Sequence, residues 1–98
     1  AVSLKKKNYY KEISGTSGLG YRLEAIEIQL VGADADRFDV YYRVHCQNFG
    51  WMGWAKNGEM AGTSGYGYRL EAIQIEVVPK GTYFSVDAAE QPASLVQP

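Results

Sequence analysis

Apolar and polar residues alternate along this chain in a way that predicts β-strands. The clearest case is residues 40–47, where all four even-numbered positions are apolar. Successive side chains of a strand point to opposite faces of the sheet. The pattern therefore predicts a core face made of Val40, Tyr42, Val44 and Cys46. The other face carries Tyr41, Arg43, His45 and Gln47.

The segment from Tyr21 to Val31 can be assigned in two ways. Leu23, Ile26 and Leu30 have helical spacing, and the run Arg-Leu-Glu-Ala favours a helix. Residues 26–30, however, alternate strictly, and residues 73–77 alternate in the same way. We predict a strand because the two copies agree and their β-branched residues favour strands.

These two strands belong to an internal repeat. Residues 15–30 return as residues 62–77, an offset of 47, with 12 of the 16 aligned positions identical. In both copies the alternation changes phase, near Glu24–Ala25 and again between Ala72 and Ile73. A β-bulge or bend at this point would keep the apolar residues on one side.

The repeat predicts how the domain is organised. Residues 1–86 form a single domain, with the back half of a first repeat at 15–31 and a complete second repeat at 40–78. At the same offset, Lys5 and Lys7 stand where the second copy has Met52 and Trp54, so the front half of the first copy is degenerate or shortened. Residues 82–86 predict one last strand, and residues 87–98 a linker or tail.

The expected fold is all-β, with antiparallel strands from tandem repeats in a pseudo-symmetric arrangement such as a prism or trefoil. Repeat units commonly need about three copies to bury a shared core. This chain has fewer, so we expect either the N-terminal stretch or a second chain, in a homo-oligomer, to complete the domain. The dipeptide Asn57-Gly58 predicts a tight hairpin turn, and residues 32–37 a connecting turn.

Composition narrows the function classes. A net charge of −1, from ten basic and eleven acidic residues, argues against a nucleic-acid or anionic-membrane partner. Residues 5–7 are three lysines, which we expect to form a solvated turn. Aromatic residues at 13% beside eleven glycines are typical of all-β extracellular modules. Cys46 is the single cysteine, so no intramolecular disulfide forms, and no apolar stretch is long enough to insert into a membrane.

The residues that we expect to bind a ligand are Trp51, Trp54, Asn48, Glu59, Tyr66 and His45. Indole faces stack on the apolar faces of sugar rings, and polar side chains nearby can orient the hydroxyl groups. The competing interpretation is that tryptophans beside Gly50 and Gly53 fill the core, which is favoured for Trp51 and evenly balanced for Trp54. Three residues apart, the two rings cannot share one face of a regular strand.

No catalytic, metal or cofactor site is indicated. His45 and Cys46 are adjacent, so on a strand they point to opposite faces, and they are too few for a metal site. The carboxylates show no glycosidase spacing, and the glycines at 15–20 lack the Lys-Ser/Thr ending of a phosphate loop. Arg22/Glu24 and Arg69/Glu71 are spaced to form ion pairs, with a polar ligand clamp as the less favoured alternative.

The run from Val44 to Thr63, continuing into residues 69–73, resembles the clostridial hydrophobic repeat with tryptophan (ChW). Three blocks fall in order: Gln-Asn-x-Gly-Trp at 47–51, Asn-Gly-Glu at 57–59 and Arg-Leu-Glu-Ala-Ile at 69–73. The resemblance covers residues 40–78 in full and 15–30 as a back half. The departures are Cys46, where an aliphatic residue is usual, and the absence of Trp-x-x-Trp from the first copy.

The resemblance implies a repeated module of secreted or wall-associated proteins of Gram-positive bacteria, and it carries over no catalytic residue. We therefore expect a non-enzymatic, extracellular or cell-surface module. Its expected ligand is carbohydrate or cell-wall polymer. The alternative is a protein–protein interaction or assembly module that binds a surface protein.

Overall fold

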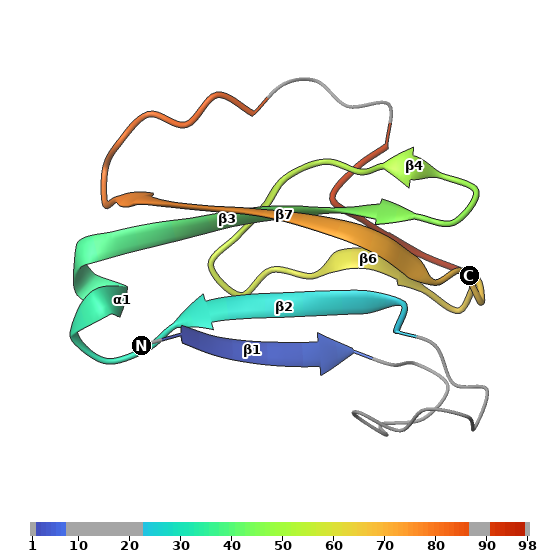
Figure 1. Cartoon of the computed structure of the whole chain (residues 1–98), viewed down its shortest axis with the longest axis horizontal. Helices are drawn as coiled ribbons and strands as arrows, with labels where there is room; N and C mark the ends of the chain where they lie inside the picture. The colour runs from blue at the N-terminus through green and yellow to red at the C-terminus, as the bar shows by residue number, and fades with distance from the viewer. Residues whose placement is uncertain (1, 8–22, 87–90, 98) are drawn as a thin grey trace.

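The structure, a computed structural model, describes residues 2–7, 23–86 and 91–97 (Figure 1). Its elements are β1 (Val2–Lys7), β2 (Ala25–Leu30), α1 (Ala33–Arg37), β3 (Phe38–Cys46), β4 (Gly50–Trp51), β5 (Ala55–Lys56), β6 (Ala61–Ser64), β7 (Leu70–Pro79) and β8 (Ser94–Val96). The predicted all-β class is confirmed. Within these ranges, no helix has the length and apolar character that crossing a membrane requires.

The strands form two sheets. The first has the order β1-β2-β6-β8, and the second has the order β4-β3-β5 with β7 also paired to β3. Figure 1 shows β1 and β2 in the lower layer and β3 and β7 in the upper layer. The described residues form two sheets, which do not test the predicted prism-like or trefoil-like arrangement, so that arrangement stays a prediction.

The core lies between β2 and β3. Its buried members are Ile26, Ile28, Leu30, Val40, Tyr42, Val44, Cys46, Met52, Ala55 and Ala61. The predicted core face of β3 is confirmed, because its four residues are at most 1% exposed. Burial also raises the pKa of the Cys46 thiol to about 11, since desolvation disfavours the thiolate.

The two copies of the repeat form equivalent antiparallel pairs. Val2 and Lys6 of β1 pair with Leu30 and Ile26. In β3, Val40 and Val44 pair in the same way with Val77 and Ile73 of β7. β1 is thus the counterpart of β3, as β2 is the counterpart of β7. The three lysines lie in strand β1, so the prediction that they form a turn is wrong. The offset of 47 misaligned them, because the two front strands align at an offset of 38.

β7 contains a β-bulge where the alternation changes phase. The register against β3 shifts between His45, opposite Ala72, and Cys46, opposite Leu70. Glu71 is therefore the extra residue. The predicted kink in the second copy is confirmed, and it allows both Leu70 and Ile73 to lie on the side of the β3 core residues.

The predicted tight turn at Asn57-Gly58 is present, but it does not close a hairpin, because β5 pairs with β3 and β6 pairs with β2 and β8 in the other sheet. Both residues have positive φ, 44° and 89°, and the Glu59 backbone N–H donates to the Lys56 carbonyl at 3.1 Å. Two consecutive left-handed residues define a type I′ turn, which Asn-Gly favours.

The turn is tied to β3 through its asparagine. Asn57 Oδ1 accepts from the Val40 backbone N–H at 2.9 Å, and Asn57 Nδ2 donates to Asp39 Oδ1 at 2.9 Å. Lys80 Nζ also donates to that carboxylate, at 3.1 Å. The Asn57 hydrogen bond, followed by that of Lys80, lowers the pKa of Asp39.

The C-terminal part of the chain differs from its prediction. Residues 82–86 lie outside any strand, so the predicted last strand is wrong. Ser94–Val96, within the predicted linker or tail, pairs in parallel with β6, and Leu95 packs against the core. The sequence did not indicate this strand, because its three residues become a strand only through a partner about 30 positions earlier. In place of the connecting turn at 32–37, Ala33–Arg37 forms a short helix.

Candidate ligand-binding site

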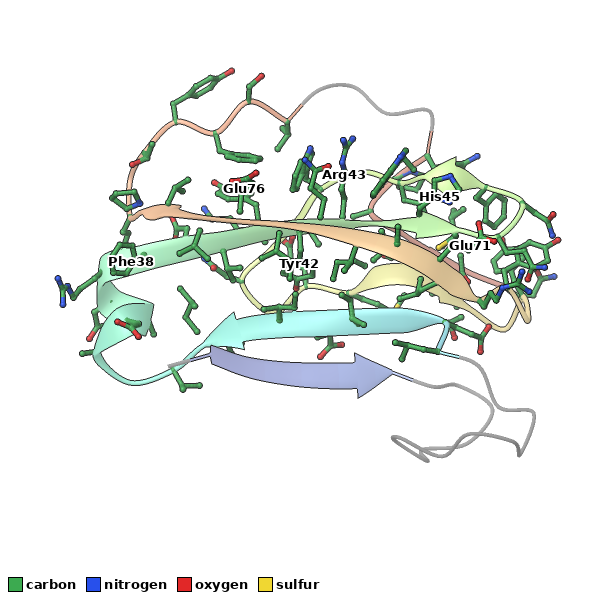
Figure 2. All side chains as sticks on the ribbon, viewed as in Figure 1. Phe38, Tyr42, Arg43, His45, Glu71 and Glu76 are labelled. Atoms are coloured by element: carbon green, nitrogen blue, oxygen red, sulfur yellow. The ribbon has the colours of Figure 1, made fainter. Side chains whose placement is uncertain are left out.

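The candidate site lies on the face of β3 that points away from the core. Figure 2 shows Arg43 and His45 on the upper side of the β3 ribbon and Tyr42 on the lower side. The chain then turns at Asn48 and Gly50, which have φ of 70° and 76°, into β4. β4 pairs with β3 so that Trp51 lies opposite His45. Strand alternation and this turn therefore place Trp51 on the outer face.

Gly53 lets Trp54 join the same face. It is outside β4 and β5, and its backbone N–H donates to the carbonyls of Gln91 and Pro92, each at 3.1 Å. A Cβ atom on Gly53 would lie 3.1 Å from the Ala93 nitrogen, so a side chain there would crowd that backbone. The segment is not a regular strand, which explains how two tryptophans three residues apart share one face.

Arg43 lies between the two tryptophans. Its guanidinium carbon is 4.8 Å from the Trp51 ring centre and 4.9 Å from that of Trp54. Its Nε donates to Gln74 Oε1 of β7 at 2.9 Å. Each cation–π contact contributes about 0.5–1 kcal/mol at an exposed site. We call Arg43, Trp51 and Trp54 the tryptophan–arginine cluster, whose parts come from separate segments of the second repeat.

Phe84 extends this cluster along the sheet. Its ring stacks on Tyr41, with the centres 4.2 Å apart and the planes at 14°, and meets Trp54 edge-on at 5.0 Å. Lys56 Nζ lies 5.5 Å from the Tyr41 ring centre. The segment that was predicted to be a strand therefore contributes an aromatic side chain to the outer face.

His45 borders the cluster on the other side. Its ring meets Trp51 edge-on at 5.3 Å, and its Nδ1 lies 3.1 Å from Glu71 Oε1. Arg69 Nη2 lies 3.6 Å from the other oxygen of Glu71, so the predicted ion pair of the second copy is confirmed. Arg22 of the first copy lies outside the described residues.

Three of the six predicted ligand residues lie together, and the other three lie elsewhere. Trp51, Trp54 and His45 come together with Arg43. Asn48 is an exposed turn residue, and the Glu59 carboxylate accepts from the Lys56 backbone N–H at 2.9 Å. Tyr66 packs on Tyr68 and on Phe49, with ring centres 5.6 and 5.2 Å apart, in a separate aromatic group.

The exposure of Trp51 corrects one expectation. Its core placement was favoured, but Trp51 is 40% exposed, whereas Met52 is fully buried. Met52 fills the core because alternation along the strand sends it inward when Trp51 points outward. The sequence did put Arg43 on the outer face, but it gave no sign that two indoles would enclose its guanidinium.

One pocket among the described residues is lined by Gln29, Leu30, Ala35, Phe38 and Asn57, none of which belongs to the cluster, and it has a volume of about 120 Å³. Pockets for drug-sized ligands measure about 300–1,000 Å³. Over the described ranges, no group of three or more His, Cys, Asp or Glu residues is arranged to hold a metal ion.

Comparison with known proteins identifies one family. A family model described as ChW, clostridial hydrophobic W, matches residues 7–32 and 45–79, which is more than half of the chain. The two matches correspond to the two copies of the repeat, so the resemblance seen in the sequence is confirmed. No curated protein and no solved structure matches the chain.

Proposed function

The chain belongs to the clostridial hydrophobic W repeat family, whose members are repeat modules of bacterial proteins, and we propose that it is a non-catalytic, cell-surface binding module. Its ligand is carbohydrate or cell-wall polymer, and it binds at the tryptophan–arginine cluster. The observation that carries this proposal is Trp51, which is 40% exposed on the outer face while Arg43 lies against its ring.

The cluster has the chemistry that such a ligand needs. An exposed indole offers an apolar face to the C–H face of a sugar ring and an N–H for hydrogen bonding. A guanidinium forms charge-assisted hydrogen bonds with carboxylates and phosphates, which occur in many wall polymers. Because Arg43 is already held by two rings and by Gln74, little side-chain entropy is lost when it binds.

Binding to purified peptidoglycan and to wall polysaccharide tests the proposal. We expect Trp51→Ala to weaken binding at least about tenfold, which corresponds to about 1.4 kcal/mol. Arg43→Lys keeps the charge but loses the planar group that stacks between the indoles, so it should also weaken binding. Tyr83→Ala is the matched control, because Tyr83 is an aromatic residue that is 87% exposed and outside the cluster.

Two results would overturn the proposal. The first is that neither material binds the parent protein. The second is that Trp51→Ala and Tyr83→Ala bind equally well. If a surface protein bound instead, in a manner that required Trp51, the function would be protein recognition by the same cluster, since tryptophan and arginine are also enriched at protein–protein hot spots.

A further inference from the structure

The same apolar strand is buried in one repeat and exposed in the other. In β2, Ile26, Ile28 and Leu30 are 4%, 2% and 6% exposed. Their counterparts in β7, Ile73, Ile75 and Val77, are 45%, 48% and 49% exposed. Three neighbouring apolar side chains that are nearly half exposed form a row of the kind that marks an interaction surface.

The second repeat buries the β2 strand in two ways. The inner face of β3 packs its core residues against those of β2. β6 pairs with the edge of β2, with Gly62 opposite Ala25 and Ala61 opposite Ile26. These contacts cover both the apolar face and the free edge of β2.

Gly62 permits the close approach of β6. Its φ is 121°, and a Cβ atom there would lie 2.8 Å from the Ala25 Cα and still closer to the Glu24 backbone oxygen. Thr63 donates its backbone N–H to that oxygen at 2.9 Å, and the Gly67 backbone N–H donates to Glu24 Oε1 at 3.0 Å. The repeated block Gly-Thr-Ser thus docks, in its second copy, on the Leu-Glu-Ala-Ile block of the first.

β7 carries the same receiving residues. Its Leu-Glu-Ala-Ile block, residues 70–73, repeats residues 23–26. Among the described strands β7 pairs with β3 alone. Its first residue, Leu70, also donates its backbone N–H to the Leu23 carbonyl at 2.9 Å, and beyond Leu70 no described strand pairs with the second edge of β7. Glu71, the counterpart of the fully buried Glu24, has a side chain that is 36% exposed.

We propose that β7 is the docking strand for a further repeat of the same family joined in tandem. The β6 equivalent of that repeat pairs with Ala72 and Ile73, and its β3 equivalent covers Ile73, Ile75 and Val77. The interface is heterologous, because a receiving strand meets a different, donating surface.

A tandem repeat fits this surface better than a second copy of this chain. The donating surface consists of the inner face of β3 and the edge of β6. In this chain β2 already occupies both. The partner must therefore be a repeat whose own donating surface is free.

A three-repeat protein tests this inference. The full chain is followed by a flexible Gly/Ser linker and then by a second copy of residues 33–97. Hydrogen exchange of the β7 backbone is compared between this fusion and the 98-residue protein. We expect docking to slow exchange in residues 70–79 at least tenfold.

Three variants of the fusion serve as controls. Ile75→Glu in the original chain, and Gly62→Val in the added repeat alone, should each abolish the slowing. Trp51→Ala in the original chain should leave the slowing of β7 exchange unchanged, because Trp51 lies on the opposite face of the sheet. This variant therefore separates a failure of the docking proposal from a failure of the glycan proposal. The 98-residue protein with Ile75→Glu should remain folded by circular dichroism.

Two outcomes would overturn the inference. One is that β7 exchanges equally fast in the fusion and in the 98-residue protein. The other is that the 98-residue protein already forms a dimer in which β7 is protected and which Ile75→Glu dissociates, because the occupant would then be a second copy.

Discussion

Ile28 and Ile75 occupy the same position in the two repeats, so a matched pair of substitutions isolates the effect of burial. Ile28 is 2% exposed and Ile75 is 48% exposed. Replacing each with alanine removes the same three carbon atoms from closely similar local sequences, in which Glu and Gln flank the isoleucine in opposite order. Differences in strand propensity therefore contribute little, and the two variants should differ through their surroundings.

The expected magnitudes follow from the burial of each residue. For Ile28→Ala, the three carbons account for about 2.4 kcal/mol at ~0.8 kcal/mol each, and the cavity left in the core raises the loss to about 3–4 kcal/mol. Ile75 is about half exposed, so Ile75→Ala loses only about half of this transfer free energy, and solvent fills the space that is left. We therefore expect the free energy of unfolding to fall by about 1 kcal/mol. For a domain of this size, 1 kcal/mol shifts Tm by about 4–8 °C.

Urea unfolding of the parent and of both variants, followed by tryptophan fluorescence and circular dichroism, measures the two losses. Unchanged m-values would show that the variants differ in native stability alone. Equal losses, or a larger loss for Ile75→Ala, would refute the conclusion that β2 is covered and β7 is not.

Three further predictions concern Gly62, Asp39 and Cys46. Gly62→Ala should lower the free energy of unfolding by more than about 1 kcal/mol, because the new methyl group meets the β2 backbone; an unchanged Tm would contradict this. Folding lowers the pKa of Asp39, so the ionised carboxylate stabilises the folded state. This stabilisation is fully present well above the unfolded pKa of about 3.9 and is lost as pH falls through the folded pKa. Asp39→Asn should therefore lose less stability than the parent between pH 6 and pH 3 in urea titrations, and equal losses would contradict it. Cys46, with a pKa of about 11, should react with a thiol reagent at pH 8 only after unfolding, and its contribution to stability should decline as pH rises from about 8.5 toward 11. Rapid labelling of the native protein would contradict this.

Much of the local structure could be predicted because neighbouring residues determine it. Alternation assigned the two faces of β3, and Asn57-Gly58 specified the type I′ turn through the positive φ of both residues. The change of phase in the second copy located the bulge at Glu71 to within one residue. Each of these features depends on a few consecutive residues.

The site could be predicted only in part. Trp51 and Trp54 stood out by residue type, but which side chains surround them depends on pairing across three strands. Arg43 becomes the centre of the cluster because β4 and the segment before β5 fold back over β3. Phe84 joins it from a segment with no regular structure, and alternation gives no information about such a segment.

The sequence by itself determined that this protein is an all-β repeat and which residues of its strands lie on a common face. It could not determine that one copy of Glu-Ala-Ile would be buried and the other exposed, since the two copies are identical there. Only the tertiary structure decided that. Local propensity depends on the residues within a segment, whereas burial depends on the distant segment that covers it, and the second repeat covers β2 while no described strand covers β7.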